Sequence, residues 1–221
     1  MGGWGEFILA LVVFLISHAI PVRPPVRPWL IARLGRTGYF VCYSLASLAI
    51  LLWLIVAAAR APYIEVIPPL EILRWLPNLA MPVVCLLAVA GMAIRNPLSF
   101  GGMGRREFDP DAPGILAASR HPLLLALCLW AGSHLLANGS LAHVILFGLF
   151  AVFAVVGMSL IDRRKKRELG SDWSRLAQNT ARLSLRLPSP PLPLWVWATA
   201  LLLWLALLLL HGPIIGMSPL P

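Results

Sequence analysis

Long stretches without a charged residue constrain this sequence more than any other feature. Uncharged and strongly apolar sequence covers residues 37–59, 75–94, 121–161 and 187–221. An α-helix rises about 1.5 Å per residue, so about 20 apolar residues cross the roughly 30 Å hydrocarbon core of a bilayer. With 59% apolar and only 12% charged residues among 221, the composition excludes an ordinary water-soluble domain. We therefore expect a chain embedded in a membrane.

The apolar pattern predicts an all-α fold, a polytopic membrane helix bundle of about six transmembrane helices in a single domain over residues 1–221. The longest uncharged run is divided by the turn signal Asn138-Gly139-Ser140. A further apolar stretch near the N-terminus supplies the first helix. Apolar residues then recur at steps of four and three from Leu169 to Leu187, which predicts an amphipathic helix on the membrane surface over about 163–186. The expected spans cover residues 4–20, 38–59, 76–95, 122–137, 141–161 and 192–211.

The distribution of basic residues predicts the orientation of these spans. Of the 18 lysines and arginines, 16 fall in the loops on one side of the predicted bundle. Cytoplasmic loops are enriched in basic residues, so this side is predicted to be cytoplasmic and both termini to lie outside. A basic rim beside a bilayer attracts anionic head groups, and we therefore expect membrane lipids as partners and no nucleic acid.

Histidines are the most informative polar residues within and beside the spans, because a polar group in hydrocarbon needs a partner or a function. His143 and His211 fall at the outer ends of spans and are interpreted as satisfied interfacial histidines. His18, His121 and His134 remain candidates for function. His134 could ligate a metal or donate a hydrogen bond to a neighbouring helix. The sequence contains the following five: His18, His121, His134, His143 and His211.

Arg120, His121 and Pro122 form a second feature, at the predicted start of the fourth span. Proline is favoured at the first helical position, and a helix N-terminus beside an arginine suits an anion or a carboxylate. An equally good interpretation is that Arg120 extends to the interface and Pro122 only starts the helix.

Several of these residues together carry a family resemblance. They are Ser17-His18 followed by Arg23 and Arg27, Arg120-His121-Pro122 with Trp130, His134-Leu135, Asn138-Gly139 and Asp162-Arg163-Arg164. With them the chain resembles the NnrU family of bacterial membrane proteins over nearly its whole length. The resemblance implies a multi-pass protein of the bacterial inner membrane that is associated with denitrification, and a respiratory or denitrification complex as a possible partner.

NnrU proteins are similar in turn to the zeta-carotene isomerase of plants and cyanobacteria, a membrane protein that uses haem b. This second resemblance implies haem b as cofactor, with His18 and His134 as ligands of the haem iron and a redox or isomerase-like role. It also implies that His121 is essential, and with Arg120 it forms our candidate catalytic pair. His134, however, lies 13 residues, or about 20 Å, along the helix from His121, whereas His18 lies near the inner face. Axial ligands must meet at one depth, so His18 and His121 are an alternative pair.

A different class of function is implied by a third resemblance. Arg120-His121-Pro122 followed by Glu168-Leu169-Gly170 and Asp172-Trp173 is similar to the membrane methyltransferases of isoprenylcysteine and phospholipids. This implies S-adenosylmethionine as an alternative cofactor. Those enzymes carry an acidic pair where residues 162–167 of this chain hold one acid followed by five basic residues. A non-catalytic assembly or partner protein of a respiratory complex is a further alternative.

Overall fold

A computed structural model describes residues 3–101 and 108–220 of the chain. Within these residues the fold is all-helical, as predicted, with seven α-helices, one short 3₁₀ helix and no β-strand. The helices are α1 (Trp4–Ala19), α2 (Val26–Arg60), α3 (Glu71–Ala93), η1 (Ile115–Ala117), α4 (Pro122–Asn138), α5 (Leu141–Leu169), α6 (Asp172–Ala177) and α7 (Leu194–Ile215).

Four of these helices, α2, α3, α5 and α7, are long and apolar enough to cross a membrane. The apolar helices α1 and α4 are shorter, at 16 and 17 residues. By the length and composition of its helices the chain is a multi-pass membrane protein. The count of six spans and the outside location of both termini stay predictions.

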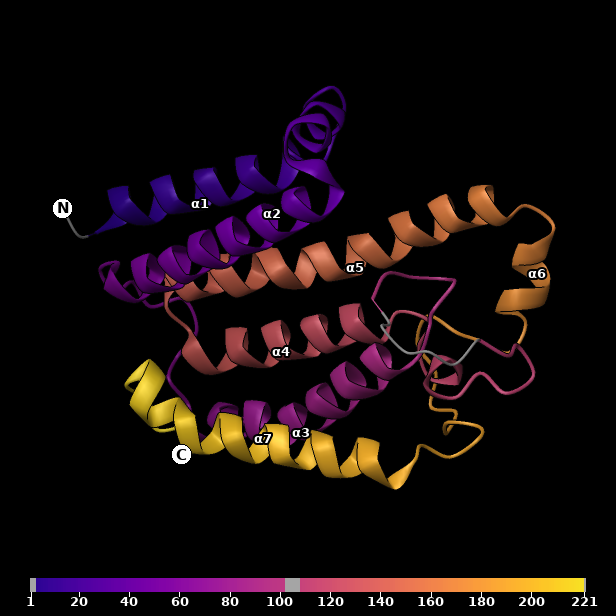
Figure 1. The fold of residues 1–221 in the computed structure, drawn as a ribbon. Helices are drawn as coiled ribbons and strands as arrows, with labels where there is room; N and C mark the ends of the chain where they lie inside the picture. The colour runs from indigo at the N-terminus through magenta and orange to yellow at the C-terminus, as the bar shows by residue number, and fades with distance from the viewer. Residues whose placement is uncertain (1–2, 102–107, 221) are drawn as a thin grey trace. The chain divides into compact units, whose positions relative to one another are not determined.

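The chain divides into two compact units. The first comprises Met1–Val66 and Ser140–Leu146. In it α1 packs against α2 (Figure 1). Phe7 and Ala10 of α1 and Leu54 and Ala57 of α2 are buried, and small residues such as these alanines allow helix backbones to approach closely.

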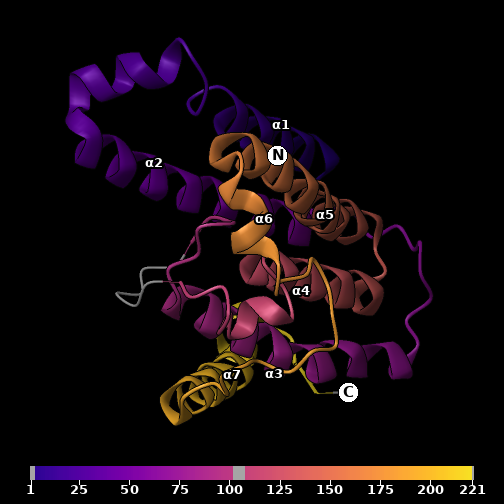
Figure 2. The same ribbon diagram turned by 90° about the vertical axis from the view of Figure 1, so that its right-hand side faces the viewer.

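Helix α2 begins twelve residues before the predicted span at residue 38, because a helical segment precedes a break at Gly35. The break has φ 70° and ψ 165°, a conformation that is essentially restricted to glycine. It separates the first part of α2, residues 26–34, which we call the arm, from the long apolar part. The change of direction is visible in Figure 2. The Tyr39 hydroxyl donates to the Pro21 carbonyl at 3.1 Å and ties the turn before the arm to the helix after the break.

The second unit comprises Ile67–Gly139 and Phe147–Pro221. Helix α3 packs against both α4 and α7 (Figure 1). A Cβ atom at Gly91 of α3 would lie 2.8 Å from the Pro122 ring, so the start of α4 approaches α3 as closely as a glycine permits. The buried core of this unit is formed by Val84, Leu87, Ala90, Leu98, Ile115, Leu116, Ala126 and Val196.

The segment after the fifth apolar run differs from the prediction. Helix α5 continues through the basic residues to Leu169 and ends before Gly170, which has φ 55°. In the rest of the predicted range the only helix is the short α6, and residues 178–193 are not helical. Residues 163–186 therefore do not form the single surface helix that the apolar pattern predicted. Trp173 and Leu176 pack against the core of the second unit. The first part of the apolar stripe therefore covers protein, whereas Leu183 and Leu187 at its end are exposed.

Candidate functional site

The start of α4 is held by a set of backbone bonds that places Arg120 and His121. His121 is the residue before the helix, and Pro122 is its first residue. The Asn96 amide donates to the Arg120 carbonyl at 2.9 Å, and the Arg120 N–H donates to the Ala181 carbonyl at 2.7 Å. Segments far apart in the sequence therefore fix both backbone groups of Arg120, the residue before His121.

The His121 ring is fully buried and engaged at both nitrogens. Its Nδ1 lies 2.9 Å from the Ser99 hydroxyl, and its Nε2 lies 2.9 Å from Oδ1 of Asp162. A carboxylate can only accept, so Nε2 carries a hydrogen and donates to Asp162. In the neutral ring Nδ1 then accepts the hydrogen of the Ser99 hydroxyl. Ser99, His121 and Asp162 thus form one continuous chain of hydrogen bonds.

Asp162 joins this chain to two arginines. Its Oδ2 accepts from Nε of Arg182 at 2.6 Å, and its Oδ1 lies 3.8 Å from Nε of Arg120. The Arg120 guanidinium also lies over the Trp173 ring, 5.6 Å from its centre. We call Ser99, Arg120, His121, Asp162 and Arg182 the polar cluster. One buried carboxylate thus interacts with two arginines from separate segments of the second unit.

The electrostatic balance of the polar cluster favours a neutral His121. Burial lowers the pKa of His121 below its ordinary value, and Asp162 acts in the opposite direction. Because the Asp162 charge is shared with Arg120 and Arg182, which themselves disfavour a further cation, burial prevails. A neutral ring also satisfies the hydrogen-bond pattern described above.

The polar cluster therefore acts first as a structural anchor. It connects the start of α4 to α5 and to the segment around Arg182. The backbone N–H of His121 donates to the Ser119 hydroxyl at 3.1 Å, so this N–H and both ring nitrogens of His121 have partners within the unit. Buried hydrogen bonds of this kind hold a core in one arrangement. Among the described residues, Nε of Arg120 is buried without a hydrogen-bond partner and interacts with Asp162 through charge alone. The assignment of His121 and Arg120 as catalytic residues stays a prediction.

His18 lies near the end of α1, in the first unit. Its Nδ1 lies 2.8 Å from the Phe14 carbonyl, four residues earlier in the helix. A carbonyl only accepts, so Nδ1 carries the hydrogen and the lone pair of the neutral ring lies on Nε2. The rings of Phe14 and Tyr43 lie 4.2 and 6.0 Å from the imidazole, between ring centres.

His134 lies in α4, in the second unit, and repeats this local arrangement. Its Nδ1 lies 2.8 Å from the Trp130 carbonyl, again four residues earlier. The hydroxyl of the preceding Ser133 also donates to that carbonyl, as the Ser17 hydroxyl does to Phe14. In both helices the sequence is an aromatic residue, two apolar or small residues, serine and histidine. No residue that the structure describes forms a hydrogen bond with Nε2 of either histidine.

The two remaining histidines have partners near the ends of their helices. His143 Nδ1 lies 2.7 Å from the Ser140 hydroxyl, and His211 Nδ1 lies 2.8 Å from the Met217 carbonyl. The interpretation of both as satisfied interfacial residues is consistent with these bonds. Like His18 and His134, His211 has its Nδ1 beside a backbone carbonyl. It is not preceded by the aromatic residue and the serine that those two histidines have in common.

Comparison with known families decides the identity of the chain. The family model described as NnrU protein matches residues 6–219. The chain belongs to the NnrU family. The predicted resemblance is thereby confirmed over nearly the whole sequence. No curated protein and no solved structure matches this NnrU chain.

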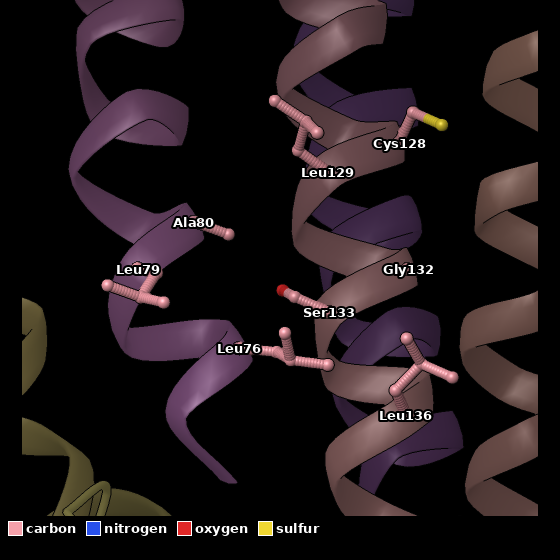
Figure 3. A pocket seen from close by; sticks show the side chains of 8 residues that line it. All are labelled: Leu76, Leu79, Ala80, Cys128, Leu129, Gly132, Ser133 and Leu136. Atoms are coloured by element: carbon pink, nitrogen blue, oxygen red, sulfur yellow. The ribbon is translucent and has the colours of Figure 1, made fainter. Parts of the chain in front are cut away.

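An apolar pocket of about 410 Å³ lies between α3 and α4 of the NnrU chain. In Figure 3 the Ser133 hydroxyl points toward α3, whereas the Cys128 sulfur points away from it. Ser133 already donates to the Trp130 carbonyl, so the pocket offers little polar recognition. None of the predicted site residues lines it. The lining residues are Leu76, Leu79, Ala80, Cys128, Leu129, Gly132, Ser133 and Leu136.

Sequence reasoning missed three members of the polar cluster, Ser99, Asp162 and Arg182. Asp162 carried a usable signal, because it is the first charged residue after 41 uncharged ones and directly follows an apolar span. A carboxylate at that place needs a partner. Nothing in the sequence indicated that Ser99 or Arg182 would reach the same place.

Proposed function

We propose that this NnrU protein binds haem b through His18 and His134 in the bacterial inner membrane and serves a redox or isomerase-like step linked to nitrogen-oxide metabolism. The proposal rests on the resemblance to the haem-binding isomerase and on the state of the two imidazoles. Haem b bound by two histidines supplies a one-electron redox centre.

The observation that carries the proposal is the shared bonding of the two histidines. Each ring donates from Nδ1 to a carbonyl one helical turn earlier, which leaves the Nε2 lone pair for a metal. A hydrogen bond from the non-ligating nitrogen to a carbonyl fixes the tautomer and orientation of a ligating imidazole and raises its basicity. Each imidazole by itself therefore offers a neutral nitrogen of the kind that haem iron accepts as a ligand.

The surroundings of the two rings also suit a haem ligand. Phe14 and Tyr43 lie beside His18, and Trp130 and Phe147 lie beside His134, with ring centres 5.5 and 5.4 Å from the latter. An apolar shell around a metal ligand limits access of water and tunes the redox potential. Among the described residues, no group of three or more histidine, cysteine, aspartate or glutamate side chains could hold a metal ion, but haem b held by histidines would need only the two proposed here.

The hydrogen bonds of the histidine rings favour the pair His18 and His134 over the alternative pair His18 and His121. His121 is bonded at both ring nitrogens, so ligation would break its bond to Ser99 or to Asp162. Leaving a buried carboxylate or hydroxyl without its partner costs about 1–3 kcal/mol. We therefore propose that His121 and Arg120 position α4, and with it His134, by anchoring its first turn.

The S-adenosylmethionine alternative has less support from the geometry. Asp162 is the acidic residue of the stretch that corresponds to the acidic pair of the methyltransferases. Both of its oxygens are engaged, by His121 and by Arg182. No observation favours this alternative over haem.

The test is the haem content of the purified protein, expressed with a haem precursor and measured by absorption before and after dithionite reduction. We expect a Soret band with sharp reduced α and β bands, and their loss in His18→Ala and in His134→Ala. His143→Ala is the matched control and should keep full haem. Retention of haem in both ligand variants contradicts the pair. Loss in His211→Ala instead of His18→Ala would move the second ligand to His211.

The link to nitrogen-oxide metabolism needs a separate experiment. Deleting the gene in its host should slow nitrite or nitric oxide consumption under denitrifying growth, and the wild-type copy should restore it. If the His134→Ala copy restores consumption as well as the wild type does, haem is not required for that role.

A further inference from the structure

The arm, residues 26–34 of α2, is largely exposed in the first unit. Arg27, Trp29 and Leu34 are all exposed, Trp29 to 58%. The only side-chain contact that the structure gives within the described part of the arm is the Arg33 guanidinium over the Trp29 ring, 5.6 Å from its centre. Gly35 turns the chain after the arm, so the arm has a direction of its own.

The charge of this region has no compensation from nearby sequence. Four arginines, at positions 23, 27, 33 and 36, lie in it, and no aspartate or glutamate occurs from residue 7 to residue 64. Among the described residues, none of the four forms an ion pair within the chain. A cluster of arginines without internal counter-charge is complementary to an anionic surface.

An open groove of about 530 Å³ runs along the arm. Arg27 is the one charged residue in its wall, beside Val22, Pro24, Pro28, Ile31 and Ala32. The positions 24, 27, 28 and 31 share one face of the helix and the turn before it. One cation at the edge of an apolar groove matches an amphiphile with an anionic head and a hydrocarbon tail.

We propose that the arm is a binding site for one anionic phospholipid of the surrounding membrane. The Arg27 guanidinium binds the phosphate, which its planar donors fit well. An acyl chain lies in the groove against Ile31 and Ala32. Trp29 anchors the arm at the interface, where tryptophan is enriched. The arm then lies flat at the head-group level, and the proposal does not depend on haem binding.

Native mass spectrometry of the full chain in uncharged detergent tests this site. The probes are phosphatidylglycerol and phosphatidylcholine with identical acyl chains, titrated separately, and inorganic phosphate alone. We expect one tight phosphatidylglycerol molecule per protein and weaker binding of phosphatidylcholine. Arg27→Gln should weaken the first phosphatidylglycerol by about tenfold, the size of one charge-assisted hydrogen-bonded contact. Phosphate alone should not compete.

Two further variants separate a built groove from general attraction to basic protein. Arg186→Gln removes an equal charge from an exposed residue outside the arm and should leave the first binding step unchanged. Ala32→Phe keeps every charge and fills the groove, so it should also weaken binding. The proposal is overturned if Arg27→Gln and Arg186→Gln lose the same affinity for the first phosphatidylglycerol molecule. It is overturned equally if Ala32→Phe leaves that affinity unchanged, or if the protein binds phosphatidylcholine as tightly as phosphatidylglycerol. Circular dichroism of each variant confirms that it is folded.

Discussion

Replacing Asp162 by asparagine should destabilise the second unit strongly. The substitution preserves the size of the side chain and removes the charge that His121, Arg182 and Arg120 share. His121 is fully buried, and the Arg120 side chain is only 16% exposed, so neither can replace the lost charge with water. Removing one partner from a buried ion pair costs about 3–5 kcal/mol.

The expected magnitude lies at the lower end of that range. The Arg182 side chain is 51% exposed, and water screens part of its interaction with Asp162. The amide oxygen of asparagine can still accept the hydrogen bond from His121. We therefore expect Asp162→Asn to lower the free energy of unfolding by about 3 kcal/mol, which is roughly a hundredfold change in the folded-to-unfolded ratio.

The free energy of unfolding is measured by circular dichroism as the fraction of sodium dodecyl sulfate in mixed micelles is increased. Asp172→Asn is the matched control, because Asp172 is 64% exposed and pairs with Arg175 at 3.4 Å on the surface of α6. It should change the free energy of unfolding by less than about 0.5 kcal/mol. If the two variants unfold within about 1 kcal/mol of each other, the polar cluster is not the anchor described here.

Two other substitutions test separate parts of the structure. Burial lowers the pKa of His121 below 6.5, so the unfolded chain binds more protons than the folded one below that pH. The contribution of neutral His121 to the free energy of unfolding is then fully present above pH 6.5, and it falls as the pH drops toward the pKa of His121 in the folded protein. His121→Gln should flatten this dependence, and an unchanged pH profile would exclude His121 as its source. Gly139→Ala should destabilise by more than about 1 kcal/mol, because Gly139 has φ 56° and a Cβ there would lie 2.3 Å from the Ile67 carbonyl oxygen. Among the described residues, a Cβ added at Gly132 would have no neighbour within 4 Å apart from the adjacent residues and the backbone of its own helix, so Gly132→Ala is the control in the same unfolding assay. Equal changes in the free energy of unfolding for the two variants would refute the steric argument.

The positions of α1 and α4 could be predicted from the sequence to within one residue. The expected spans 122–137 and 4–20 correspond to α4 and α1, and the turn signal at Asn138-Gly139-Ser140 separates α4 from α5. These features depend on hydrophobicity, helix rise and glycine conformation, which act over a few neighbouring residues. The arm was missed because its arginines interrupt the apolar pattern, although helical structure does not require an uncharged sequence.

The candidate ligands and the polar cluster differ in how far along the chain their hydrogen-bond partners lie. The bonds of His18 and His134 reach back four residues within one helix. Sequence therefore determines them almost alone, once a helix forms. His121 finds Ser99 and Asp162 at separations of 22 and 41 residues. Only the packing of α4 against its neighbours decides those partners, because a hydrogen bond between distant segments requires both to be placed within about 3 Å.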